Sequence, residues 1–185
     1  EDNVHNIAID GDFDDCQAMV KALFNDLEFR DKINLSAVNS INWARVMAQV
    51  VYYFTSAVAL GAPERRVSYS VPTGNFGDVY AGYIAKEMGL PIEKLIVATN
   101  INDILTRTLT GGEYKVGVTI ATISPSMDIQ VSSNFERLLY NIYDGSAADV
   151  RNLMESLKQQ GEFTIGDGQL ERAKSTFKAL RESED

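Results

Sequence analysis

The residues best suited to bind a ligand form a short loop, Thr73-Gly74-Asn75-Phe76-Gly77-Asp78. An apolar stretch typical of a strand precedes it, and a helical pattern follows it. The two glycines allow the backbone to turn sharply and to approach a ligand closely. A helix that begins here presents unpaired N–H groups and the positive end of its dipole to the loop. The pattern therefore predicts a site for a phosphate or another anion.

Two interpretations of this loop stay open from spacing alone. The glycines can simply make a turn between strand and helix, or they can bind a phosphate beyond the carboxyl end of a parallel strand. The third glycine of the dinucleotide fingerprint and the Gly-Lys-Ser/Thr of the Walker loop are both absent, so a small phosphate monoester fits better. Thr73 and Asn75 can add side-chain donors. Asp78 would repel a phosphate, and we expect it to cap the helix or to turn away.

A second polar cluster lies where another expected strand gives way to a helix. It consists of Asn39, Ser40, Asn42 and Arg45. Ser40 or Asn42 can cap the helix while Arg45 stays on the surface. Alternatively the cluster contacts a cofactor or substrate, and Arg45 binds a carboxylate or phosphate with two hydrogen bonds. The cluster is expected near the same sheet edge as the glycine loop.

Other polar groups give weaker indications of a site. Asp10, Asp12, Asp14 and Asp15 lack the glycine and glutamate of an EF-hand, so we expect a helix start with Asp12 or Asp14 as N-cap. Segment 124–128 either lines a site or forms a proline turn in which Asp128 caps the next helix. No histidine lies near a serine in the sequence, so a hydrolase triad is unsupported. The chain has one cysteine and one histidine, so we expect no transition-metal site.

The composition excludes several functional classes. The 185 residues are 45% hydrophobic and 23% charged, as in a soluble globular protein, and the net charge is −9. A nucleic-acid partner is not expected, because it requires clustered Lys and Arg. The apolar stretches are too short to span a bilayer. The lone Cys16 cannot form an internal disulfide, and we expect a reducing, cytoplasmic location.

The order of elements predicts an α/β fold: a mostly parallel open sheet with helices on both faces, followed by C-terminal helices. Strands are expected over residues 6–10, 33–38, 66–71 and 95–99. Helices are expected after residue 15 and over 27–30, 43–59, 78–88, 102–110, 133–143, 146–160 and 167–182, whereas 115–131 has no clear pattern. Helical spacing places Trp43, Tyr52, Tyr53 and Phe54 in the core.

Five segments together resemble the threonine synthases. They are residues 10–17, 39–45, 71–91, 98–105 and 124–129, and they include Val71-Pro72-Thr73-Gly74-Asn75-Phe76-Gly77-Asp78. The resemblance runs from about residue 4 to 142 and fades after residue 145. Ordered matches in several segments are far more specific than a glycine pattern.

The resemblance implies a pyridoxal-phosphate enzyme of fold type II, similar to the β subunit of tryptophan synthase. Such enzymes convert O-phospho-L-homoserine and water to L-threonine and phosphate, and the cofactor serves as an electron sink. Carried over from the family, Gly74, Asn75, Phe76 and Gly77 hold the cofactor phosphate, with Thr73 and Asp78 beside them. The resemblance also suggests that Asn39, Ser40, Asn42 and Arg45 contact the substrate.

In the family, the Schiff-base lysine lies in a segment upstream of residue 1. We therefore expect this chain to be the central piece of the enzyme, with residues 1–38 from the small domain and 39–185 from the large domain. It should contain no catalytic residue and should not make threonine alone; Lys21 and Lys86 are expected in solvent. Two alternatives stay open: a non-catalytic module that binds phosphate or cofactor, and another fold-type-II lyase. The sequence leaves the oligomeric state open.

Overall fold

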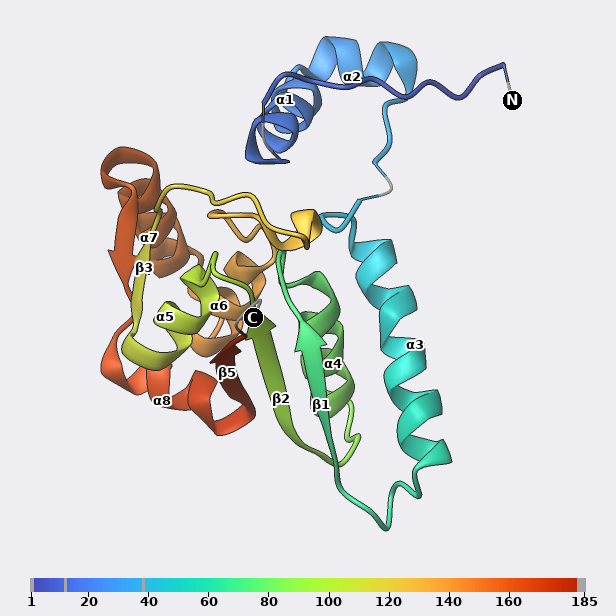
Figure 1. The fold of residues 1–185 in the computed structure, drawn as a ribbon, viewed down its shortest axis with the longest axis vertical. Helices are drawn as coiled ribbons and strands as arrows, with labels where there is room; N and C mark the ends of the chain where they lie inside the picture. Colours follow the sequence, from blue (N-terminus) through green and yellow to red (C-terminus); the bar gives the residue numbers. More distant parts are fainter. Residues whose placement is uncertain (1, 12, 38, 183–185) are drawn as a thin grey trace. The chain divides into compact units, whose positions relative to one another are not determined.

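The computed structural model describes residues 2–11, 13–37 and 39–182 (Figure 1). It divides into two compact units, Glu1–Ala37 and Val38–Asp185. The assignment of residues 1–38 to a small domain and of 39–185 to a large domain stays a prediction.

The first unit consists of two helices that pack on each other, α1 (Phe13–Asn25) and α2 (Leu27–Ile33). The Asp26 side chain caps α2 by accepting a hydrogen bond from the Phe29 N–H at 3.0 Å. Since α1 begins at Phe13, Asp14 lies inside the helix and is not its N-cap. The other expected cap, Asp12, lies outside the described residues.

Both strands predicted in the first unit are wrong. Residues 4–9 are irregular, and Ile7 is 84% exposed. A strand needs a neighbour that completes its hydrogen bonds, and no described strand pairs with this segment. Over 33–38, Ile33 belongs to α2, residues 35–37 are irregular, and Val38 lies outside the described residues. Asn34 ends α2 in the left-handed conformation, where asparagine is favoured.

The second unit contains a parallel sheet in the order β1-β2-β5, which confirms the predicted fold class. The strands are β1 (Val67–Pro72), β2 (Ile92–Thr99) and β5 (Phe177–Arg181). Strands β3 (Glu113–Lys115) and β4 (Glu162–Thr164) form a separate antiparallel pair. The helices are α3 (Trp43–Ala59), α4 (Gly77–Glu87), α5 (Ile104–Gly111), α6 (Phe135–Ile142), α7 (Ala147–Gln160) and α8 (Asp167–Thr176), with a 3-10 turn at Pro125–Met127.

The predicted helix over 167–182 is wrong in its second half. Helix α8 ends at Thr176, and residues 177–181 form β5, paired with residues 95–99 of β2. Phe177 is buried against the aromatic side chains of Phe76 and Tyr83. Pairing with β2 and burial of Phe177 therefore override the helical preference of the charged sequence.

Helices α3 and α4 lie side by side next to the sheet (Figure 1). A Cβ on Gly82 of α4 would lie 2.7 Å from the ring of Tyr53 in α3, so only glycine permits this close approach. Tyr53 is buried as predicted, and Phe54 is partly buried. Trp43 and Tyr52 are 41% and 44% exposed, so their placement in the core was wrong.

Candidate functional site

The glycine loop lies at the carboxyl end of β1, where the chain enters α4. Thr73 continues the strand pairing, because its N–H donates to the Ala98 carbonyl at 2.8 Å. The Thr73 hydroxyl donates to the Val71 carbonyl at 2.6 Å and is buried. Phe76 takes the left-handed conformation, with φ of 62°, and thereby turns the chain into the helix. Its side chain packs between Phe135 and Phe177 in the core.

The N–H groups of residues 74–79 donate to no acceptor in the described part of the chain. No side chain caps α4 either. These donors lie at the N-terminus of an 11-residue helix, where the helix dipole is positive. Buried N–H groups are almost always paired in folded proteins, and Phe76 is only 1% exposed. A row of donors without acceptors is therefore suited to an anionic ligand.

Gly74 of the loop has no room for a side chain, and Gly77 has little. A Cβ on Gly74 would lie 2.8 Å from the Ser126 carbonyl oxygen, and one on Gly77 would lie 3.2 Å from Asn134 Nδ2. In Figure 1 the 3-10 turn that contains Ser126 lies over the end of β1. The loop is therefore packed closely against the Ser126 turn, Ser40 and Asn134, and its own backbone groups are left to face a ligand.

The carbonyl groups of the loop are held by the segment that leads into α6. Ser132 Oγ donates to the Gly74 carbonyl at 2.9 Å. The Asn75 carbonyl accepts from Asn134 N–H at 3.1 Å and from Asn134 Nδ2 at 3.0 Å. The side-chain oxygen of Asn75 accepts from Ser133 Oγ at 3.1 Å. Its amide nitrogen donates to no described residue, so it can still serve a ligand.

Asp78 turns toward α3. Its Oδ1 accepts hydrogen bonds from the hydroxyls of Tyr52 and Tyr53, the latter at 2.9 Å. Burial, together with the Asp78 carboxylate, raises the pKa of both tyrosines, so they stay protonated donors. Of the two expected arrangements, Asp78 therefore turns away and does not cap α4. These hydrogen bonds hold the Asp78 carboxylate against α3.

The structure brings part of the second polar cluster to the loop. Ser40 lies against Gly77: its carbonyl accepts from Asn134 Nδ2 at 2.8 Å. The Asn39 side chain accepts from the Ile41 N–H, and the Asn42 side chain caps α3 by accepting from the Ala44 N–H at 2.9 Å. Arg45 is exposed on α3. Capping by Asn42 is thus present, and the substrate contacts of the four residues stay predictions.

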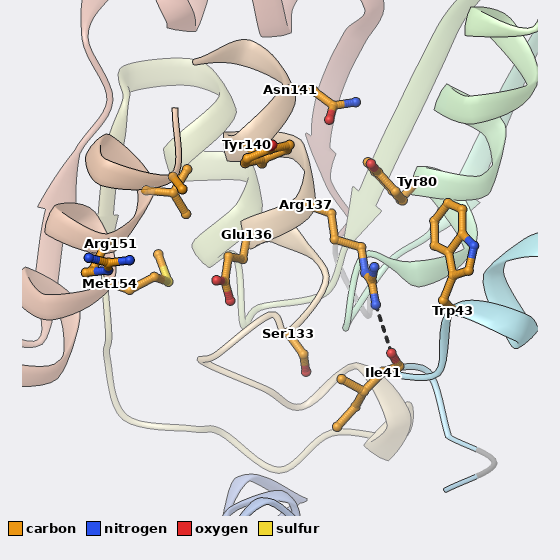
Figure 2. Close-up of a pocket in the computed structure, with 12 residues that line it drawn as sticks. Ile41, Trp43, Tyr80, Ser133, Glu136, Arg137, Tyr140, Asn141, Arg151 and Met154 are labelled. Atoms are coloured by element: carbon orange, nitrogen blue, oxygen red, sulfur yellow. Dashed lines mark hydrogen bonds between the residues drawn. The ribbon is translucent and has the colours of Figure 1, made fainter. Parts of the chain in front are cut away.

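Arg137 also joins these segments, and no local pattern in the sequence indicated it. Arg137 of α6 donates from Nε to Asn134 Oδ1 at 3.0 Å and from Nη2 to the Ile41 carbonyl at 2.9 Å. Its guanidinium lies over the ring of Trp43, 5.4 Å from the ring centre. Figure 2 shows Arg137 beside Trp43 and pointing toward Ile41, and these residues line a pocket of about 850 Å³. The same pocket is lined by Tyr80, Ser133, Glu136, Tyr140, Asn141, Ala147, Val150, Arg151 and Met154.

A buried network holds segment 116–131 over the carboxyl end of β2. Asp128 Oδ1 accepts from Asn100, Asn102 and the Thr122 hydroxyl at 2.7–3.1 Å. Burial alone would raise the pKa of Asp128, but these hydrogen bonds outweigh it and hold the pKa below its usual value. One interpretation expected Asp128 to cap α6, and this was wrong, because Asn134 occupies the N-cap position. The network positions the turn that abuts Gly74.

Lys86 lies in the last turn of α4, at the opposite end of the helix from the glycine loop. Its Nζ is 3.5 Å from the Glu93 carbonyl. Among the described residues, no three His, Cys, Asp or Glu side chains are grouped as metal ligands would be. None of the described helices has both the length and the apolar character that crossing a bilayer requires.

The chain is similar over its whole length to part of known threonine synthases. It is 53% identical over 184 residues to the Pseudomonas aeruginosa enzyme and 47% identical over 195 residues to the Saccharomyces cerevisiae enzyme. These matches cover 100% and 99% of the chain, so the expectation that similarity fades after residue 145 was wrong. No protein-family model matches the chain.

Solved structures agree with the sequence comparison. A pyridoxal-phosphate-bound threonine synthase from Brucella melitensis superimposes with a TM-score of 0.88 at 62% identity and covers 98% of the chain. The yeast threonine synthase superimposes with a TM-score of 0.83 at 46% identity. The chain spans 39% of the Pseudomonas protein and 39% of the Brucella chain.

Proposed function

The chain is homologous to a segment of the threonine synthases, and we propose that the loop of residues 74–77 binds the phosphate group of pyridoxal phosphate. The carrying observation is the row of N–H groups that has no acceptor in the described structure, in a loop where Gly74 has no room for a Cβ and Gly77 has little. The similarity to a pyridoxal-phosphate-bound neighbour supports this assignment.

The residues around the loop have separate tasks in this proposal. The N–H groups of Gly74, Asn75, Phe76 and Gly77 donate to the phosphate, and the α4 dipole adds favourable charge. Asn75 Nδ2 is a further donor. The Thr73 hydroxyl is occupied by the Val71 carbonyl, so Thr73 shapes the entrance to the loop. Asp78 contributes by staying on Tyr52 and Tyr53, which limits its repulsion of the phosphate.

For the parent protein, the longer enzyme of which this chain would be a segment, we propose conversion of O-phospho-L-homoserine and water to L-threonine and phosphate. When bound, pyridoxal phosphate supplies an electron sink for this chemistry. Ser40 has the best support among the proposed substrate contacts, because it lies against Gly77. Asn39, Asn42 and Arg45 share its turn and the first turn of α3.

We further propose that the Schiff-base lysine belongs to a segment outside residues 1–185. The position of Lys86 supports this, because it lies at the far end of α4 from the loop. The chain alone would then bind the cofactor phosphate without forming threonine. We also propose a cytoplasmic location, on the basis of the single cysteine.

The test compares pyridoxine 5'-phosphate with pyridoxine, two ligands that lack the aldehyde and so cannot react with surface lysines. We expect the chain to bind the phosphate ester at least tenfold more tightly in equilibrium dialysis, because hydrogen bonds to a charged group are worth about 1.5–3 kcal/mol each. Gly77→Val should abolish the preference. Equal binding of the two ligands, or an unchanged preference in Gly77→Val, would refute the proposal.

The activity of the parent is tested on a longer chain that includes the lysine segment. Threonine and phosphate should form together from O-phospho-L-homoserine. Phosphate release without threonine would instead indicate another lyase of this fold, and binding without any turnover would indicate a non-catalytic module.

A further inference from the structure

Asn134 is completely buried and joins three segments that are far apart in the sequence. Its Nδ2 donates to the Ser40 carbonyl at 2.8 Å and to the Asn75 carbonyl at 3.0 Å. Its Oδ1 accepts from Arg137 Nε at 3.0 Å. Both donor hydrogens and the acceptor of its side chain are thus used inside the protein. An amide buried in this way fixes the distances between the turn, the loop and α6.

Arg137 extends this connection to the start of α3. Its Nη2 donates to the Ile41 carbonyl at 2.9 Å, so two consecutive carbonyls of the turn, Ser40 and Ile41, are held from α6. The guanidinium also lies over Trp43, the first residue of α3. Figure 2 shows these groups on one side of the pocket, away from Arg151 and Met154.

The hydrogen bonds from Asn134 also act on the peptide group between Asn75 and Phe76, which belongs to the loop. Its carbonyl accepts two hydrogen bonds from Asn134, and its N–H is one of the donors without an acceptor in the described structure. The peptide unit is planar, so holding the oxygen also directs the N–H. Hydrogen bonds in a chain polarise one another, which makes that N–H a stronger donor.

We propose that Asn134 and Arg137 are positioning residues that hold the Ser40–Ile41 turn and the Asn75–Phe76 peptide in one arrangement, and so couple anion binding at the loop to the first turn of α3. The inference rests on the proposed phosphate-binding function of the loop. In the parent enzyme it would link occupancy of the cofactor site to the turn proposed to contact substrate.

Trp43 is a built-in reporter of this coupling, because it is the single tryptophan of the chain and contacts Arg137. Titration with inorganic phosphate should change its fluorescence along the same curve as binding measured by dialysis. Asn134→Ala should weaken phosphate binding at least tenfold. Arg137→Lys keeps the positive charge but loses the planar guanidinium, whose Nε and Nη2 make the two hydrogen bonds, so it should lose most of the fluorescence response and bind phosphate several-fold more weakly.

Glu136→Gln is the matched control, since Glu136 is exposed on α6 between the two positioning residues. It should match the original chain in binding and in fluorescence response. Thermal unfolding shows whether each variant is folded; if Asn134→Ala is not, Arg137→Lys alone decides.

The outcomes separate the two proposals. If the original chain binds no phosphate, the function proposed for the loop fails and the coupling fails with it. If the chain binds phosphate but Arg137→Lys retains full affinity and the full Trp43 response, only the coupling is overturned.

Discussion

Replacing Gly74 with alanine should damage the loop, although the change adds only one methyl group. The new Cβ would lie 2.8 Å from the Ser126 carbonyl oxygen and 3.4 Å from Met127 Cα. Both neighbours are backbone atoms, so no side chain can rotate out of the way. The loop and the Ser126 turn must therefore separate, by about 0.5 Å if an ordinary contact is to be restored.

Two effects follow from that separation. Overpacking of this kind costs about 1–3 kcal/mol of folding stability. The same shift weakens the contacts that the loop N–H groups make with a phosphate. Because a hydrogen bond to a charged group is worth about 1.5–3 kcal/mol, the loss of even one should reduce phosphate affinity about tenfold or more.

Gly168→Ala provides the matched control for Gly74→Ala. Gly168 lies in α8, and a Cβ there would meet no atom within 4 Å. Alanine is the better helix former by about 0.8–1.0 kcal/mol, so this variant should be slightly more stable and bind phosphate normally. Urea unfolding and phosphate dialysis measure both quantities. Equal stability and equal affinity of the two variants would refute the packing argument.

Three further changes test other parts of the second unit. Gly82→Ala should lower stability by about 1 kcal/mol or more despite its helix propensity, since its Cβ would lie 2.7 Å from the Tyr53 ring; greater stability in urea unfolding would contradict this. Asp128→Asn should cost about 2 kcal/mol at pH 7. Because the pKa of Asp128 is lowered in the folded state, its contribution to the free energy of unfolding is present above about pH 4 and is lost as pH falls further. The stabilities of the original chain and of Asp128→Asn should therefore converge in acid. A difference that stays constant with pH would count against this reasoning. Tyr52→Phe should weaken phosphate binding a few-fold, since Asp78 loses a donor that holds it on α3; unchanged dialysis results would show that this contact has no influence on the loop.

The glycine loop could be predicted because its information is local. A strand, two glycines and a helix start occupy neighbouring positions, and their spacing alone indicates unpaired N–H groups at a sheet edge. Asn42 could be predicted as a cap of α3 for the same reason. The order of strands and helices likewise indicated a parallel sheet.

The residues that hold the loop could not be predicted, because their contacts join distant segments. Asn134 looked only like the start of a helix, and Arg137 like an ordinary helical residue; their contacts to residues 40 and 41 arise only in the fold. Strand β5 was missed for a related reason, since its residues favour a helix until β2 is beside them. Residues 6–10 show the reverse case, an apolar segment that has no pairing strand among the described residues.

The strand order β1-β2-β5 also has a consequence for folding. Strands β1 and β2 are joined through α4 by a short connection, so their pairing involves a modest loss of chain entropy. Strand β5 reaches β2 only after the long segment from α5 to α8 has been arranged, and pairing across such a separation is slow. A growing chain can therefore form the glycine loop early, whereas the far side of β2 stays an open edge until residues 177–181 have been synthesised.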